Sequence, residues 1–184
     1  IKSPYLRACS TRSAELRTRL KPERELLCGL SWISKNSQIG SFKTLSLASL
    51  LPILNVDGTQ WINLQYGDTR IEREALQERG KRFLTNVESV DNFNDLDGLA
   101  ALIDACDLII TVSNTTAHLA GALGKKVLIL LPHSAGLLWY WHLDTADSLW
   151  YPSAKLLRQP RPNDWESVIE EARRDVQAYV ASHA

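Results

Sequence analysis

A short polar stretch near the middle of the chain has the residue types of an anion-binding helix start. It consists of small, hydrogen-bonding residues followed by a histidine: Ser113, Asn114, Thr115, Thr116, Ala117 and His118. Apolar runs at residues 108–112 and 127–131 flank it, which predicts a strand, a turn, a short helix and a strand. The first amides of a helix are unpaired and lie at the positive end of its dipole. The stretch therefore predicts phosphate binding by these amides and by the threonine hydroxyls, although an ordinary helix N-cap has the same pattern.

Apolar segments alternate with amphipathic helical patterns from residue 26 onward, as in a parallel sheet with helices on both faces. Strands are predicted at residues 26–32, 61–65, 84–90, 108–112, 127–131 and around 156–157. Helices are predicted at residues 45–54, 70–79 and 96–106, after residue 114, and at 165–176. The buried faces expected for the helices at 96–106 and 165–176 are Leu96, Leu99, Leu102, Ile103 and Cys106, and Trp165, Val168, Ile169, Ala172 and Val176. Asp95 is the expected N-cap of the helix at 96–106, and either Asn163 or Asp164 is the expected N-cap of the helix at 165–176. The pattern predicts an α/β domain.

Ligands of such sheets bind beyond the carboxyl ends of the strands. Polar residues expected there are Lys35 or Lys43, Gln65, His133 and the stretch at 113–118. A nucleotide-type ligand bound at that edge would meet these side chains. Each also has an ordinary alternative: a solvated lysine, a histidine fixed by a neighbouring carbonyl, and a polar residue at a strand end.

The overall composition is that of an ordinary globular protein. The 184 residues are 45% hydrophobic and 23% charged, with a formal net charge of +0. This balance gives no reason to expect a nucleic acid or an anionic membrane as partner. No apolar run approaches the roughly 18 residues that span a bilayer, and no signal-peptide pattern opens the chain. The 3 cysteines lack metal-ligand spacing, so we expect a reduced, cytoplasmic protein without a metal site.

The amino-terminal part has a different character. The chain begins at Ile1 and contains 0 methionines, so we expect a fragment of a longer protein. Residues 1–25 are interpreted as a linker or arm from a missing N-terminal region. Residues 26–184 are interpreted as the folded domain.

Several short motifs follow one another in an order that is typical of a family of bacterial enzymes. They are Gly-Leu-Ser-Trp at 29–32, Leu-Gln-Tyr-Gly at 64–67, Asn-Phe-Asn-Asp at 92–95, the segment 113–131, Trp-Tyr-Pro-Ser at 150–153 and Leu-Arg-Gln at 157–159. The set resembles the C-terminal domain of glycosyltransferases related to the heptosyltransferases of family nine. It is similar above all to the glycosyltransferase half of tetratricopeptide-repeat proteins, which are compared with the O-linked N-acetylglucosamine transferases. The resemblance covers about residues 26–179.

The resemblance implies a GT-B architecture, in which two Rossmann-like domains face each other across a cleft and this chain is the C-terminal half. That half would bind a nucleoside-diphosphate sugar, with uridine as the expected base and no further cofactor. The acceptor, a protein or a glycan, would be bound mainly by the missing N-terminal domain. No catalytic residue is identified, and the fragment by itself is expected to be inactive. The donor-binding residues implied are Lys43, Gln65, Ser113, Asn114, Thr115, Thr116, Ala117 and His118.

One departure from the family pattern keeps other functions open. Heptosyltransferases carry Asp-Thr where this chain has Ser113 and Asn114, and that Asp engages the donor sugar, so heptose is disfavoured. The same departure supports an alternative, a degenerate domain that acts as a protein-binding scaffold through its aromatic loop at residues 133–152. A dinucleotide-dependent enzyme is a third possibility, disfavoured because no G-x-G-x-x-G follows the first strand.

Overall fold

The computed structural model describes residues 4–20, 25–78 and 84–183 of the chain. Its centre is a six-stranded sheet in the order β3-β2-β1-β4-β5-β6, in which every pairing is parallel. The strands are β1 (Leu26–Ser31), β2 (Thr59–Asn63), β3 (Leu84–Thr85), β4 (Leu108–Val112), β5 (Val127–Leu131) and β6 (Ala154–Arg158). This strand order is that of a Rossmann-like fold, in which the order reverses between β1 and β4. The fold class predicted from the sequence is confirmed.

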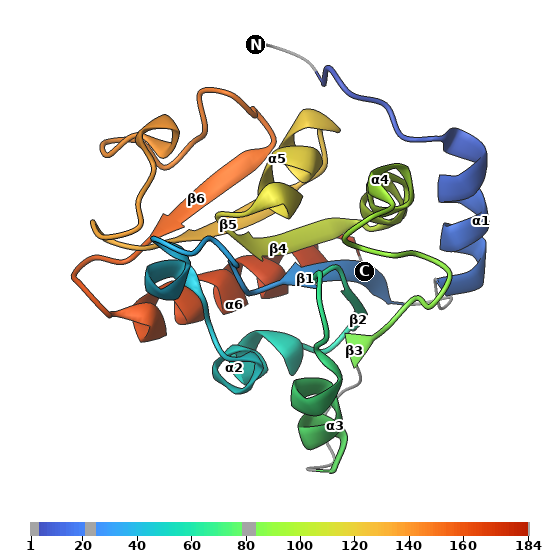
Figure 1. The fold of residues 1–184 in the computed structure, drawn as a ribbon, viewed down its shortest axis with the longest axis horizontal. Helices are drawn as coiled ribbons and strands as arrows, with labels where there is room; N and C mark the ends of the chain where they lie inside the picture. Colours follow the sequence, from blue (N-terminus) through green and yellow to red (C-terminus); the bar gives the residue numbers. More distant parts are fainter. Residues whose placement is uncertain (1–3, 21–24, 79–83, 184) are drawn as a thin grey trace.

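Helices cover both faces of the sheet (Figure 1). The helices are α1 (Ser10–Leu20), α2 (Leu51–Leu54), α3 (Arg70–Glu78), α4 (Leu96–Ala105), α5 (Thr115–Ala122) and α6 (Trp165–Ala181), with 3-10 turns η1 (Gly40–Lys43), η2 (Leu47–Leu50) and η3 (Trp139–Trp141). One apolar cluster joins α4 and α5 to the sheet, and a second joins α2 and α6 to the opposite face. Because both faces are covered, β4 and β5 are buried along their whole lengths, which explains their continuous apolar sequences.

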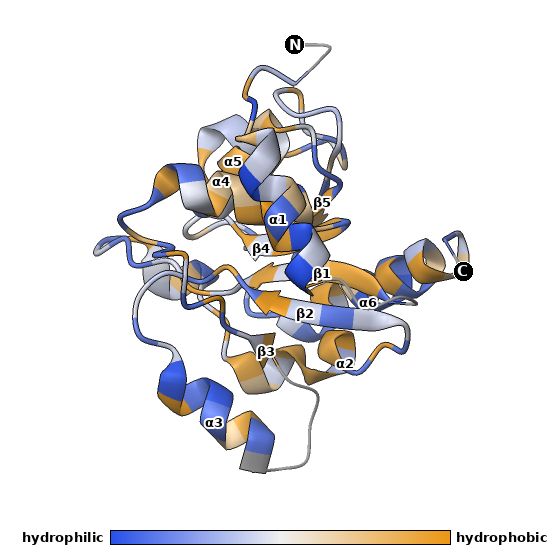
Figure 2. Cartoon of the chain, turned by 90° about the vertical axis from the view of Figure 1, so that its right-hand side faces the viewer, coloured by the Kyte–Doolittle hydropathy of each residue, from blue (hydrophilic) through white to orange (hydrophobic). Residues whose placement is uncertain are grey.

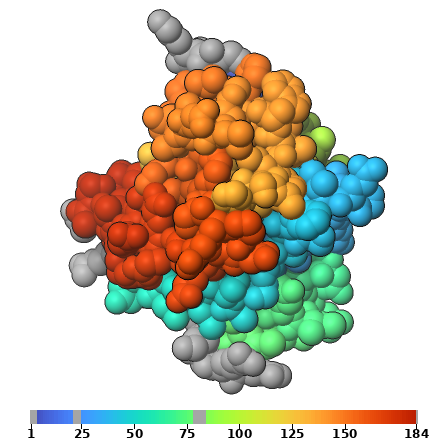
Figure 3. All heavy atoms as spheres, turned by 90° about the vertical axis from the view of Figure 1, so that its left-hand side faces the viewer, coloured from blue at the N-terminus to red at the C-terminus, as the bar shows by residue number. Residues whose placement is uncertain are grey.

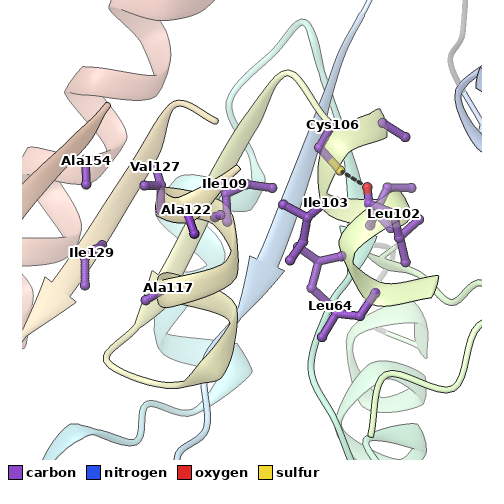
Figure 4. Close-up of a cluster of buried hydrophobic side chains, with 14 of the residues drawn as sticks. Leu64, Leu102, Ile103, Cys106, Ile109, Ala117, Ala122, Val127, Ile129 and Ala154 are labelled. Carbon is purple, nitrogen blue, oxygen red and sulfur yellow. Dashed lines mark hydrogen bonds between the residues drawn. The ribbon is translucent and has the colours of Figure 1, made fainter. Parts of the chain in front are cut away.

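The cluster beneath α4 and α5 contains one of the three cysteines (Figure 4). Cys106 is buried at the end of α4, and its Sγ donates a hydrogen bond of 3.3 Å to the carbonyl of Leu102. Burial raises the pKa of the Cys106 thiol to about 12. The side chain therefore packs as a small apolar group, as its sequence context indicates.

Residues 10–20, within the segment interpreted as a linker or arm, form α1 and lie against α4. Two ion pairs hold α1 there: Arg12 Nη2 to Asp95 Oδ2 and Arg17 Nη2 to Asp107 Oδ1, each at 2.6 Å. Asp95 also caps α4 by accepting from the amide of Gly98 at 2.8 Å, as predicted from the sequence. The arm is thus anchored at both ends of the helix it covers.

Three local predictions are wrong. Residues 45–54 form η2 and a four-residue α2 rather than one helix, because Pro52 stands in the first turn of α2 and starts a new element. The strand expected at 84–90 stops at Thr85, and Val87 and Val90 are buried in the turn that follows. Leu96, expected on the buried face of its helix, is 55% exposed.

The N-cap of α6 is Asp164, whose carboxylate accepts from the amide of Ser167, while Asn163 adopts a positive φ of 66° just before it. This excludes the capping box that Asn163 and Glu166 would have formed. The apolar stripe of α6 is as predicted from the sequence, with Val168, Ile169, Ala172 and Val176 buried. Figure 2 shows the contrast with α3, which is largely hydrophilic and lies at the rim of the fold.

Candidate functional site

The start of α5 lies at the carboxyl edge of the sheet, directly after β4. Asn114 is its N-cap, with an extended backbone and a side-chain oxygen that accepts from the amide of Thr116 at 3.0 Å. The Nδ2 group of Asn114 donates to the hydroxyl of Ser31 at 2.8 Å and to the carbonyl of Ile33 at 3.1 Å. The Asn114 side chain therefore ties the loop after β1 to the end of β4 and is occupied by these contacts.

Gln65 makes further hydrogen bonds to the same loop after β1. Its Oε1 accepts from the Ser31 hydroxyl and from the amides of Trp32 and Ile33, at 2.7–3.0 Å. Its Nε2 donates to the Tyr66 carbonyl, and the whole side chain is buried. The structure thus places Gln65 at the edge where the sequence put it, with its polar atoms directed at the backbone of its own chain. We call the bonds of Gln65, Ser31 and Asn114 the latch.

Lys43 lies in η1 and is only 3% exposed, yet it makes no ion pair or hydrogen bond with any residue that the structure describes. Burial lowers the pKa of its ammonium group, and no neighbouring carboxylate opposes that shift. A buried cation without a counter-charge is costly in free energy unless an anion meets it. This combination is the strongest chemical signal in the described part of the chain.

His118 stands one turn into α5, near Lys43. Its ring stacks on Trp141 with centroids 5.0 Å apart and planes inclined by 17°, and Tyr140 meets it edge-on at 5.1 Å. Its Nδ1 lies 2.8 Å from the Tyr151 hydroxyl. Burial first, and then the charge of Lys43, lower the pKa of His118, so the imidazole is held neutral near pH 7. Lys43 thus contributes positive charge beside a neutral imidazole.

The other predicted residues of the stretch differ in what they offer a ligand. Ser113 is buried, and its Oγ accepts from Trp141 Nε1 at 2.8 Å. Ala117 and Thr116 are fully buried, and the Thr116 hydroxyl has no hydrogen-bond partner. Thr115 is exposed at the helix start. Thr116 and Ala117 direct their amides at Asn114, whereas the Thr115 amide finds no partner in the described ranges.

A cavity of about 310 Å³ adjoins the start of α5 on the side of β2. Its lining residues are Lys35, Tyr66, Asn92, Phe93, Leu96, Leu99, Thr115 and Thr116. The rings of Tyr66 and Phe93 are 6.1 Å apart, and the Lys35 ammonium lies 5.8 Å from the Tyr66 ring centre. The Oδ1 of Asn92 is buried without a partner. Sequence reasoning gave no role to Tyr66, Asn92 or Phe93, although all three fall within the quoted motifs.

The loop of residues 132–152 covers the other side of this edge, beside the segment that holds η1 (Figure 3). The backbone at Gly136 approaches Phe42 so closely that a Cβ there would lie 2.8 Å from the Phe42 Cβ. Arg158 holds the same loop by donating to the carbonyls of Trp141 and His142. His133 donates its amide to Gln159 Oε1 at 3.1 Å, and its Nδ1 is buried without a partner. This loop thereby fixes the aromatic rings around His118.

A larger hollow, of about 710 Å³, lies between η2 and the start of α6. None of its lining residues belongs to the latch or to the group around Lys43. Among the described residues, no cluster of three or more His, Cys, Asp or Glu side chains has the arrangement of a metal site. Within the same ranges, no helix is both long and apolar enough to cross a membrane.

Comparison with known proteins supports the fold and leaves the family open. No family model matches the chain. Protein FlbA of Caulobacter vibrioides is 33% identical to it over 131 residues, which is 71% of this chain and 21% of that protein. The chain thus spans about a fifth of the length of this curated relative.

Two solved structures share the fold. A glycosyl transferase family 9 protein from Veillonella parvula DSM 2008 matches with a TM-score of 0.60 and 12% identity over 96% of this chain and 53% of that one. The ADP-heptose lipopolysaccharide heptosyltransferase II of Escherichia coli matches with a TM-score of 0.61 and 15% identity over 97% and 54% of the two chains. The chain therefore shares its six-stranded Rossmann-like fold with about half of each of these two glycosyltransferases.

Proposed function

We propose that this chain is the donor-binding domain of a glycosyltransferase and that it binds a nucleoside-diphosphate sugar, with uridine as the base. The observation that carries the proposal is Lys43, a side chain only 3% exposed that has no counter-charge among the described residues and whose charge acts on His118 of α5. A diphosphate would supply the missing negative charge. The Thr115 amide and the positive end of the α5 dipole lie at the same edge and would add to the attraction.

The adjoining cavity gives the nucleoside a place. Its volume of about 310 Å³ is at the lower end of the range of small-molecule sites. The rings of Tyr66 and Phe93 offer flat apolar surfaces for a base, and Thr115 and Thr116 belong both to this cavity and to the helix start. A ligand with its base in the cavity and its diphosphate at the start of α5 would bring the phosphate farther from the base to Lys43.

In a complete enzyme the reaction would be a displacement at the anomeric carbon. The acceptor oxygen forms a bond to that carbon, the bond from the carbon to the diphosphate oxygen breaks, and the acceptor proton passes to a base. Lys43 and the α5 amide would stabilise the negative charge that develops on the leaving diphosphate. We assign the base and the acceptor site to a second domain. Tetratricopeptide repeats and a cytoplasmic location are further proposals about the whole protein.

Isothermal titration of the chain with UDP and with ADP tests the proposal. We expect UDP to bind and Lys43→Met to weaken its binding at least tenfold, which corresponds to about 1.4 kcal/mol. Lys126→Met is the matched control, because Lys126 is exposed at the opposite end of β5. A folded chain that binds neither nucleotide, or equal affinities for the two lysine variants, would contradict the proposal. Tighter binding of ADP than of UDP would overturn the assignment of the base alone.

One observation favours a second candidate, a protein-binding scaffold. Large apolar side chains of the loop at 132–152 face solvent, with Trp139 76%, Leu143 68% and Leu149 59% exposed. Surfaces of this kind mark protein interfaces as well as domain contacts. The titration separates the two functions, because a scaffold has no reason to keep a buried, unpaired Lys43.

A further inference from the structure

His118 is held on three sides by aromatic residues of the loop at 132–152. Trp141 stacks on its face, Tyr140 meets it edge-on, and the Tyr151 hydroxyl lies 2.8 Å from Nδ1. The remaining nitrogen, Nε2, has no hydrogen-bond partner among the residues described. An imidazole fixed in this way has one nitrogen committed to the protein and one left for a ligand.

Tyr151 is built into the fold by close packing against α5. A Cβ at Gly121 would lie 2.3 Å from Tyr151 Cγ, so a side chain larger than hydrogen at Gly121 would displace the ring. The Tyr151 amide donates to Ser148 Oγ at 3.2 Å, which fixes the backbone on the other side. Gly121 follows His118 by three residues, so both face the same loop from one side of the helix.

The Tyr151 hydroxyl keeps its proton over the whole physiological range. Burial, followed by a side-chain hydrogen bond with Tyr5, raises its pKa well above the ordinary value for tyrosine. A phenol that stays protonated has a proton to donate, and a neutral imidazole that accepts at Nδ1 carries its own proton on Nε2.

We propose that Tyr151 is a positioning residue of this site: its hydroxyl donates to Nδ1 of His118, so that the imidazole presents an N–H at Nε2 to the diphosphate of the ligand. The ligand part of this inference rests on the proposed function, whereas the state of the imidazole does not. Trp141 contributes by fixing the plane of the ring, and its own Nε1 is tied to Ser113.

Nitrogen NMR of the chain labelled in its histidine rings tests the state of the imidazole directly. We expect the His118 signals of the wild type near pH 7 to be those of the neutral form with the proton on Nε2. Tyr151→Phe keeps the ring against Gly121 and removes only the hydroxyl, so it should give a mixture of the two neutral forms. Tyr179→Phe is the control. It removes a hydroxyl that donates to the Asp107 carbonyl, far from this site, and should leave the His118 signals unchanged. His118→Gln assigns the signals.

Titration with UDP tests the link to the ligand. Tyr151→Phe should weaken UDP binding about fivefold, as expected for the loss of one oriented hydrogen bond. The Tyr179→Phe control should retain the wild-type affinity. If the wild type binds no UDP, the proposed function fails while the NMR result still decides the state of His118. A wild-type proton on Nδ1, or an unchanged imidazole in Tyr151→Phe, would overturn the inference.

Discussion

Two groups of polar residues lie at the carboxyl edge of the sheet, and they are used in opposite ways. In the latch, the polar atoms of Gln65 and Asn114 form hydrogen bonds with Ser31 and with the backbone after β1. By contrast, the Lys43 ammonium group, Nε2 of His118 and, in the adjoining cavity, the Thr116 hydroxyl have no hydrogen-bond partner in the described ranges. The comparison separates residues that shape the edge from residues that the edge leaves for a ligand.

The largest expected effect breaks the latch. Gln65→Leu preserves the approximate volume and leaves the amides of Trp32 and Ile33 without an acceptor. Each unsatisfied buried donor costs about 1–3 kcal/mol, so the free energy of unfolding should fall by roughly 3 kcal/mol in urea denaturation. Gln77→Leu, on the exposed surface of α3, is the control and should change it by less than about 0.5 kcal/mol. Equal effects of the two changes would mean that the latch contributes nothing to stability.

The next prediction is a gain in stability, and it comes from Lys43. Lys43→Met removes a buried charge while keeping most of the side-chain volume, so the folded chain should become more stable. We expect the melting temperature to rise by about 2–4 °C, or roughly 1 kcal/mol for a domain of this size. A fall in the melting temperature, read by calorimetry, would show that Lys43 has a structural partner instead.

A third prediction concerns the effect of pH on His118. The groups around its ring include Lys43, Tyr140 and Tyr151. In the free chain the pKa of His118 is lowered, by burial and by Lys43, so the imidazole is neutral near pH 7. A bound diphosphate would raise that pKa again, because negative charge favours the imidazolium. UDP binding should therefore take up a fraction of a proton and strengthen as the pH falls from 7.5 to about 6. Titrations in buffers of different ionisation enthalpy measure the uptake, which should vanish in His118→Gln; proton release would contradict the prediction.

The smallest effect compares two fully buried threonines. Thr111 donates to Asn114 Oδ1 or the Val112 carbonyl, at 3.0 and 2.9 Å, whereas the Thr116 hydroxyl has no partner. Thr111→Val should cost about 1 kcal/mol of unfolding free energy, and Thr116→Val should be nearly neutral. Urea denaturation of the pair reads the difference. A larger loss of unfolding free energy in Thr116→Val would mean that the Thr116 hydroxyl stabilises the fold, as the latch residues do.

Periodicity and caps predicted most of the fold from the sequence. The buried strands β4 and β5 have the predicted bounds, because a strand covered on both faces is apolar at every position. Asp95 was identified as a cap from its place before an apolar stripe. Periodicity failed at the edge strand β3 and near Pro52, where few residues pair and local backbone geometry decides.

The site was harder to predict than the fold. The sequence placed Gln65, Asn114, Lys43 and His118 at one edge, and the structure brings them to that edge. Residue type does not tell whether a buried amide or ammonium finds a partner within the chain, since that depends on loop conformation. Lys43 illustrates the difficulty: a lysine is ordinarily solvated, and only the structure, in which Gly136 of the loop at 132–152 closely approaches Phe42 of η1, shows that this one is buried.

The central claim is that the edge around Lys43 and the start of α5 binds a diphosphate. Backbone amide NMR of the chain during titration with UDP tests it most directly, because the unpartnered Thr115 amide lies at that point. We predict a saturable downfield shift of the Thr115 amide proton, absent in Lys43→Met and retained in Lys126→Met. Shifts confined to the hollow between η2 and the start of α6, with Thr115 unmoved, would contradict the claim.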